Sequence, residues 1–217
     1  MKITTKIISI LMALLMFILC FAGCGVYSPD IDDSLKTVEV GDTIEFGHYE
    51  QDNNTSNGKE IIEWIVLAKN SDTILVISKY ALDCREYNKD DISVNWETCS
   101  LRKWMNGSFV NSAFSSGERK MIAHAVLPVD KVFLLSVPEA NKFFSSNVAR
   151  KCEPTEYAIA QDTYVFDDNT CLWWLRSSDF SDTTGSVDSE GAVLINISSV
   201  QYSRAAIRPA ICIRLGN

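Results

Sequence analysis

The chain has 217 residues, of which 47% are hydrophobic and 22% are charged. This profile is that of a globular protein and excludes a disordered, fibrous or low-complexity chain. The net charge of −8 argues against a nucleic-acid binder, which needs a basic face, and two histidines leave little for a histidine-rich metal site.

The first 24 residues predict export and lipidation. Lys2 and Lys6 precede an apolar run over 7–21, and small residues follow where a signal peptidase cuts. Residues 21–24, Phe-Ala-Gly-Cys, resemble the lipobox of bacterial lipoprotein precursors, with Phe21 in place of the usual Leu. The resemblance implies that residues 1–23 are a signal peptide and that Cys24 is acylated, with fatty acids such as palmitate. Two acyl chains give stable anchoring.

Two other interpretations of this segment stay open. Residues 7–29 carry no charge and are long enough to remain as a transmembrane anchor, because about 20 apolar residues span a bilayer. Plain secretion is the third interpretation. Lipid anchor and transmembrane anchor place the domain on the same extracytoplasmic face of the cell membrane, so we predict that location. The predicted partners are the membrane, through the N-terminal lipid, and an extracellular ligand; nucleic acid is not among them.

The mature chain begins with a polar stretch, 24–38, which we interpret as a flexible spacer before a folded body over 39–217. In that body, residues 43–49 alternate between apolar and polar and predict a strand. Two β-rich runs, 61–68 and 73–78, are joined by Asn-Ser-Asp and predict a hairpin.

The middle of the chain predicts short helices. Residues 101–105 carry apolar side chains at helical spacing, and Asn106-Gly107 predicts the end of that helix. Ser115 and Ser136 are each followed three residues later by Glu, which is typical of a capping box at a helix start.

The last third predicts strands and loops, with apolar runs at 171–175, 192–197 and 207–213. The order of strands, helices and strands indicates an α+β fold rather than βαβ repetition. We therefore expect a single compact domain with short antiparallel sheets, a few short helices and long irregular loops.

Five segments together resemble a known family. They are 62–67 (IEWIVL), 95–106 (NWETCSLRKWMN), 130–136 (DKVFLLS), 173–177 (WWLRS) and 208–210 (RPA). In this order they resemble the bacterial "domain of unknown function 6273" family, over about residues 41–213. That family is distantly similar to the C-type-lectin-like fold, as found in formylglycine-generating enzymes and in the variable proteins of diversity-generating retroelements. The resemblance implies a C-type-lectin-like α+β domain with a loop-rich ligand face near the C-terminus.

The predicted ligand face combines a strand with the polar region after it. In a strand Trp174 and Arg176 point to one side, where an indole and a guanidinium would suit a sugar or a peptide. The alternative is that both belong to the core. In the fold that the chain resembles, ligands are met between residues 180 and 202, although an ordinary solvated loop is the alternative. The predicted ligand-binding residues are Trp174, Arg176, Asp179, Asp188, Asn196, Ser198 and Tyr202.

Two further expectations concern where the predicted ligand face lies in the fold. The segments 173–176 and 208–210 should be neighbouring strands of one sheet. The polar parts 178–189 and 198–204 should then lie at the surface, because a buried polar loop would leave backbone groups unpaired.

The cysteines after Cys24 are odd in number, so at least one is unpaired. Export permits disulfides. Cys84 and Cys99 are candidates for a disulfide, worth about 3 kcal/mol if unstrained. Cys152 and Cys171 are a second candidate pair, and buried free thiols are the alternative to both.

The sequence carries no nucleophile elbow, zinc-binding helix, P-loop or nucleotide fingerprint. We predict no catalytic residue, no metal ion and no cofactor. The first hypothesis is a membrane-anchored binding lipoprotein whose ligand is a glycan, a peptide or a partner protein. The alternatives are an enzyme on a formylglycine-generating-enzyme-like fold and a structural envelope protein without a small ligand.

Overall fold

The computed structural model describes residues 30–177 and 182–216, and residues 35–217 are one compact unit. The predicted signal peptide and Cys24 lie outside the described residues. Asp30–Thr37, where the sequence predicts a spacer, is the helix α2, and its Leu35 is buried. None of the helices in the described ranges has the length and apolar character that a membrane span requires.

The compact unit is an α+β fold with two sheets. The first sheet has the order β1-β2-β3-β11-β5, with β6 also paired to β11, and all its pairs are antiparallel. The predicted hairpin is confirmed, since Asn70 accepts the backbone N–H groups of Asp72 and Thr73 in its turn. The strands of the first sheet are β1 (Thr43–Tyr49), β2 (Glu60–Lys69), β3 (Thr73–Ser78), β5 (Ile122–Ala123), β6 (Val132–Phe133) and β11 (Ala210–Arg214).

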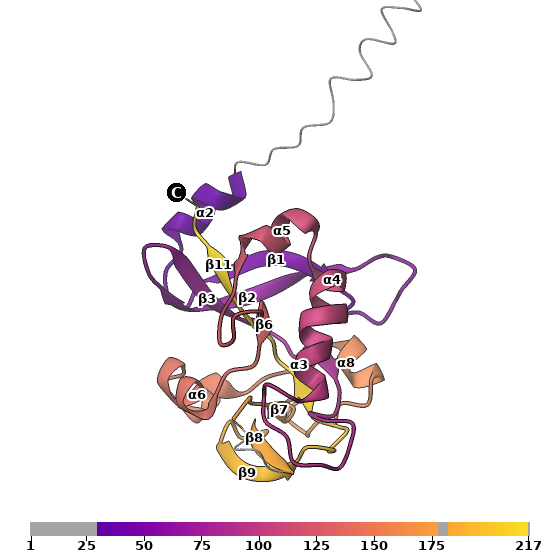
Figure 1. Cartoon of the computed structure of the whole chain (residues 1–217). Helices are drawn as coiled ribbons and strands as arrows, with labels where there is room; N and C mark the ends of the chain where they lie inside the picture. Colours follow the sequence, from indigo (N-terminus) through magenta and orange to yellow (C-terminus); the bar gives the residue numbers. More distant parts are fainter. Residues whose placement is uncertain (1–29, 178–181, 217) are drawn as a thin grey trace, which may run out of the picture. The chain divides into compact units, whose positions relative to one another are not determined.

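The second sheet has the order β4-β10-β7-β8-β9, and its β10–β7 pair is parallel while the others are antiparallel. Figure 1 shows β8 and β9 at the opposite end of the unit from β1 and β2. The strands are β4 (Asp83–Cys84), β7 (Trp173–Trp174), β8 (Thr183–Val187), β9 (Val193–Ser199) and β10 (Ala206–Ile207).

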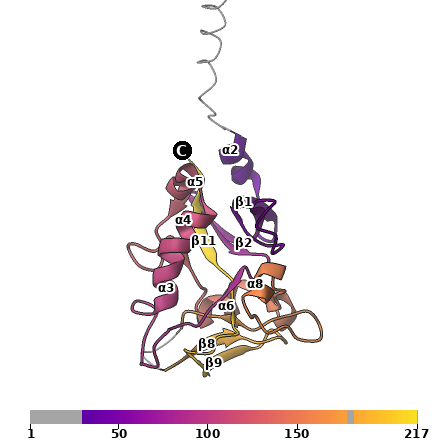
Figure 2. The same ribbon diagram turned by 90° about the vertical axis from the view of Figure 1, so that its right-hand side faces the viewer.

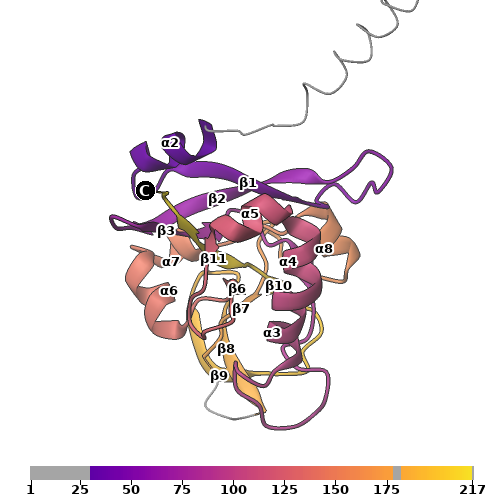
Figure 3. The ribbon, with the colours of Figure 1, turned by 45° about the horizontal axis from the view of Figure 1, so that its top comes forward.

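Short helices cover the sheets. Figure 2 shows α3 and α4 along one side of the unit and α8 on the other, and Figure 3 shows α3 and α6 flanking β7. Both predicted capping boxes are confirmed, at α5 and α6. The helices are α3 (Ser100–Trp104), the π-helical η1 (Met105–Phe109), α4 (Val110–Ala113), α5 (Ser116–Met121), α6 (Val137–Phe143), α7 (Asn147–Arg150) and α8 (Glu156–Ala160).

The predicted helix end at Asn106-Gly107 is wrong, because the chain continues without a break through η1 into α4. Asn106 does not cap the helix. Its side-chain amide instead donates to the carbonyls of Arg102 and Val132 and accepts from the N–H groups of Lys131 and Val132. A tertiary contact therefore overrides the local stop signal.

The last strands connect the two sheets. The expectation that 173–176 and 208–210 are neighbouring strands of one sheet is wrong: the strand beside β7 is β10 (Ala206–Ile207), whose Ala206 pairs with Trp173, while Ala210 lies in β11 of the other sheet. After β10 the chain enters β11 of the first sheet, and the connecting Arg208 and Pro209 are both buried. Arg208 thus lies where the two sheets meet.

The expectation that 178–189 is a surface segment is wrong for Thr183–Val187, which is the strand β8. Thr184 and Ser186 are fully buried. Burial is tolerated because the Thr184 hydroxyl donates to the carbonyl of Ser177 at 3.0 Å, and the Ser186 hydroxyl bonds that of Ser198 at 2.8 Å. A polar sequence can form an interior strand when its hydroxyl groups find partners.

Candidate functional site

Trp174 is not part of a ligand face. Its side chain is fully buried, its indole N–H donates to the carbonyl of Arg85 at 2.8 Å, and its ring packs edge-on against Tyr87. The prediction fails because β7 lies between β10 and β8 and is covered on both faces, so that Trp173 is buried as well. The alternative interpretation, a core tryptophan, is the observed one.

Arg176 is held firmly at the end of β7. Its two Nη atoms form a bidentate ion pair with Glu139 of α6, with Nη2 at 2.8 Å from Oε1, and Nη1 also donates to the carbonyl of Leu134. Burial would raise the pKa of Glu139, but the hydrogen bonds from Arg176 and Ser136 outweigh it and hold that pKa below its ordinary value. The pair therefore stays ionised at neutral pH and fixes α6 against β7.

Arg176 also lines a groove of about 310 Å³. This groove, called here the Arg176 groove, combines three parts of the chain that are distant in sequence. Its walls are mixed, with half-exposed apolar side chains beside hydroxyl, amide and charged groups, as in a small recognition site. The lining residues are Asn95, Trp96, Glu97, Val126, Leu127, Ser136, Arg176 and Ser177.

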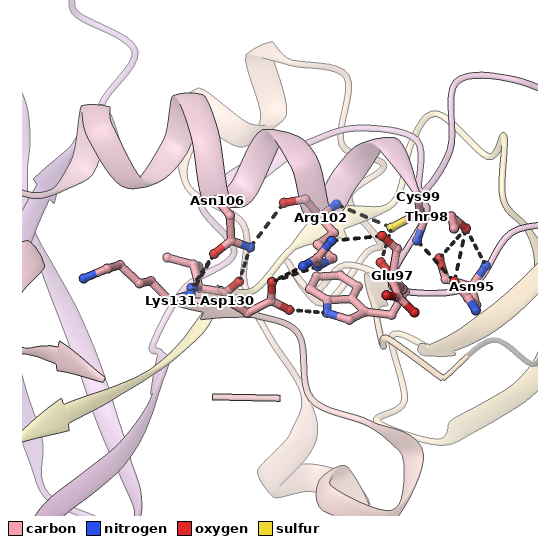
Figure 4. A network of polar contacts seen from close by, with 10 residues as sticks. Asn95, Glu97, Thr98, Cys99, Arg102, Asn106, Asp130 and Lys131 are labelled. Atoms are coloured by element: carbon pink, nitrogen blue, oxygen red, sulfur yellow. Dashed lines mark hydrogen bonds and ion pairs between the residues drawn. The ribbon is translucent and has the colours of Figure 1, made fainter. Parts of the chain in front are cut away.

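A buried carboxylate supports two of these walls (Figure 4). Asp130 is fully buried and accepts from the Trp96 indole N–H at 2.8 Å and from Arg102 Nε at 2.7 Å. Arg102 Nη2 also lies 2.7 Å from the Asp130 carboxylate, and Arg102 Nη1 donates to the carbonyl of Glu97. The segment 95–97 is thereby tied to the loop before β6.

The same loop carries Val126 in a strained conformation. The N–H of Leu127 donates to the carbonyl of Ala125 at 2.7 Å, which closes a γ-turn with Val126 at its centre and a φ of 65°. Turns of this hand are rare, and positive φ is unfavourable for a β-branched residue. Val126 is nevertheless 44% exposed at the groove, so burial does not explain the choice of residue. Such strain is typical of functional loops.

Replacing Val126 by Gly should raise the free energy of unfolding by about 1 kcal/mol, because relief of the positive-φ strain exceeds the entropic cost of glycine. A urea titration measures this. Val129→Gly is the matched control, since Val129 is exposed in the same loop without positive φ, and it should be destabilising. A loss of stability in Val126→Gly equal to that of the control would contradict the strain.

The remaining predicted ligand residues do not join the groove. Asp188 accepts the N–H groups of Glu190 and Ala192 and organises the turn before β9. Ser198 is bonded to Ser186, whereas Asn196 and Tyr202 are exposed. Asp179 lies outside the described residues. Of the predicted set, Arg176 alone lines the groove as the structure describes it.

The predicted Cys84–Cys99 disulfide is wrong, since both residues are free thiols with separate partners. The Cys84 thiol donates to the carbonyl of Ser203, and Cys99 caps α3 by accepting the N–H of Arg102. Burial raises the pKa of each thiol to about 11, which leaves them protonated and unreactive. Cys152 and Cys171 are also buried free thiols, and Cys171 donates to the carbonyl of Cys152.

Three carboxylates, those of Glu50, Asp52 and Glu60, come within 4.8 Å of one another. Their oxygens accept hydrogen bonds from the loop that they enclose: Glu60 from the N–H of Gln51, and Glu50 from that of Asn54. These carboxylates therefore stabilise the loop, and this structural role accounts for their proximity.

Three of the sequence segments that resemble the family contribute to the groove, although the sequence alone does not show that they lie together. Residues 95–106, 130–136 and 173–177 are the segments that carry the family resemblance, and in the structure they meet around Arg176 and Asp130. No local sequence signal marks Val126, whose φ is positive within a loop that is closed by a hydrogen bond from the Ala125 N–H to the Asp130 carbonyl.

The architecture defines a compact α+β domain with two curled, mainly antiparallel sheets. The chain belongs to the family described as "Domain of unknown function (DUF6273)", whose model matches residues 71–215. The matched range includes most of both sheets and every residue that lines the Arg176 groove. No curated protein and no solved structure matches the chain.

Proposed function

We propose that this protein is an exported lipoprotein, anchored through Cys24 to the extracytoplasmic face of the membrane, whose domain binds a glycan, a peptide or a partner protein in the Arg176 groove. The strained γ-turn at Val126 carries the proposal, because an exposed and costly conformation at a groove is otherwise unexplained. The loop-rich α+β architecture supports a distant likeness to C-type-lectin-like binding domains.

Binding is favoured over catalysis by the chemistry of the lining. The titratable side chains among the described lining residues are Glu97 and Arg176, and Arg176 is already paired with Glu139. The Ser136 hydroxyl caps α6, and the Ser177 hydroxyl accepts the N–H of Val137. A nucleophile next to a general base, which acyl or phosphoryl transfer would need, is not among these residues.

The full-length protein in neutral detergent should be screened against glycan and peptide arrays. Glu97 is exposed at the groove, so Glu97→Ala should weaken a genuine hit about fivefold or more without unfolding the protein. Glu39→Ala removes an equally exposed acid elsewhere and should leave binding unchanged. Hits that respond equally to both variants, or to neither, would refute the groove as the binding site.

The anchor is tested separately. Mass spectrometry of the membrane-extracted protein should find acylated Cys24 as the N-terminus, and Cys24→Ala should leave an uncleaved precursor or release the protein. An unmodified N-terminus at another residue would overturn the lipoprotein assignment while leaving the binding proposal intact.

A further inference from the structure

A second cavity, of about 250 Å³, lies between residues 85–89 and helix α3. It is called here the Arg85 cavity, and it shares no lining residue with the Arg176 groove. Three of its side chains are cationic and one is acidic, in a chain whose net charge is −8. The lining residues are Arg85, Glu86, Lys89, Ser100, Leu101, Lys103 and Trp104.

Arg85 differs from every other arginine of the described chain. Each of the others donates at least one hydrogen bond to a carbonyl or carboxylate oxygen. Within the described residues the Arg85 guanidinium donates none, and its Nε is buried without a partner. A guanidinium offers five N–H donors, so most of its bonding capacity is unused by the protein.

The Arg85 side chain is nevertheless fixed in place. Its guanidinium lies over the Trp104 ring, 4.3 Å from the centroid, and Trp104 in turn packs against Phe109. The nearest carboxylate, that of Asp83, is 3.8 Å from Nε and is itself committed to the Tyr49 hydroxyl and the Cys84 N–H. Stacking holds the plane of the guanidinium and leaves its edge, in a side chain 38% exposed, for another acceptor.

The flanking charges are available as well. Lys89 and Lys103 are both exposed, and neither takes part in an ion pair within the described ranges. The apolar floor of the cavity, Leu101 and Trp104, comes from α3. The Arg85 guanidinium is held in place, two further cations lie beside it, and apolar side chains line the cavity below. This combination suits a carboxylate or a phosphate group on a small organic ligand.

We propose that the Arg85 cavity binds a small ligand bearing a carboxylate or a phosphate, with the edge of the Arg85 guanidinium as bidentate donor and with Lys89 and Lys103 as flanking charges. The volume is below that of sites for drug-sized molecules, which is consistent with a ligand of about monosaccharide size. This site is independent of the proposed function of the Arg176 groove.

Isothermal titration calorimetry of the full-length protein in neutral detergent tests the proposal at constant ionic strength. Glucuronate, glucose 6-phosphate, inorganic phosphate and neutral glucose are the probes. At least one of the three oxyanions should bind and glucose should not; comparison of glucuronate with glucose 6-phosphate then identifies the preferred oxyanion. Absence of heat with all three, or equal binding of glucose, would overturn the proposal.

Variants locate the site. Arg85→Gln should weaken oxyanion binding about tenfold or more, because a charge-assisted bidentate contact is lost. Arg85→Lys should recover only part of the oxyanion affinity, since an ammonium group lacks the planar pair of N–H donors of a guanidinium. Lys120→Gln, which removes the same charge from the exposed side of α5, is the matched control. If Arg85→Gln does not fold, the double variant Lys89→Gln/Lys103→Gln serves instead, and affinities equal to that of the control would refute the site.

Discussion

Replacing Asp130 by Ala is expected to lower the free energy of unfolding by about 3–5 kcal/mol, because a largely buried ion pair loses its carboxylate. Arg102, whose side chain is 14% exposed, would keep its charge with no carboxylate to offset its desolvation. The Trp96 indole N–H would lose its acceptor as well. Urea denaturation of the variant and of the wild type measures the difference.

Asp167→Ala is the matched control for this variant. Asp167 is exposed, and its replacement should change the stability by no more than about 0.5 kcal/mol. The Asp130 carboxylate also ties the groove segment 95–97 to the loop of Val126, through Trp96 and Arg102, so Asp130→Asn should impair ligand binding in the Arg176 groove. A loss below about 1 kcal/mol in Asp130→Ala would mean that the pair contributes little.

The parts of the fold that sequence predicts well are those fixed by local interactions. The capping boxes at Ser115 and Ser136 satisfy backbone N–H groups within one turn of the helix. The turn at Asn70 likewise uses its own side chain to bond the two residues that follow. These signals need no knowledge of the rest of the chain, and each of them predicts the observed element.

The errors arise where a distant segment supplies the partner. Asn106 bonds residues 131 and 132 rather than ending its helix, and Ser186 becomes interior because Ser198 of the next strand meets its hydroxyl. A periodicity of two correctly separates the faces of β7, but it cannot tell that both faces are covered. That requires the tertiary packing, in which the Trp174 ring contacts Tyr87 and the Trp173 ring contacts Phe144.

The candidate site shows the same division. The sequence predicts Arg176 as a ligand residue, whereas no sequence signal places residues 95–97 and 126–127 beside it in one groove. Their convergence depends on one buried carboxylate, Asp130, whose partners are 28 and 34 positions away in the chain. The importance of Arg85 has no sequence signal, since it rests on the hydrogen bonds that this arginine does not make.

Replacing Arg208 by Ala is expected to lower the free energy of unfolding by about 3–5 kcal/mol, through a cavity and the loss of buried hydrogen bonds. Arg208 is 1% exposed, and its guanidinium donates to the carbonyls of Ser78, Arg150 and Lys79. The rings of Phe144 and Trp173 lie 5.4 and 5.1 Å from it. It therefore joins β3, the end of α7 and β7 at the point where the chain passes from one sheet to the other.

Arg204→Ala is the matched control, because Arg204 lies on the same segment but is 42% exposed, with a 3.5 Å ion pair to Asp162. Its loss should cost at most about 1 kcal/mol. Arg208→Lys should rescue little, since one ammonium cannot reach three carbonyls from the same position and its burial without a carboxylate is unfavourable. Equal stability of the Arg208→Lys variant and the wild type would show that the charge, rather than the planar fork, holds the two sheets together.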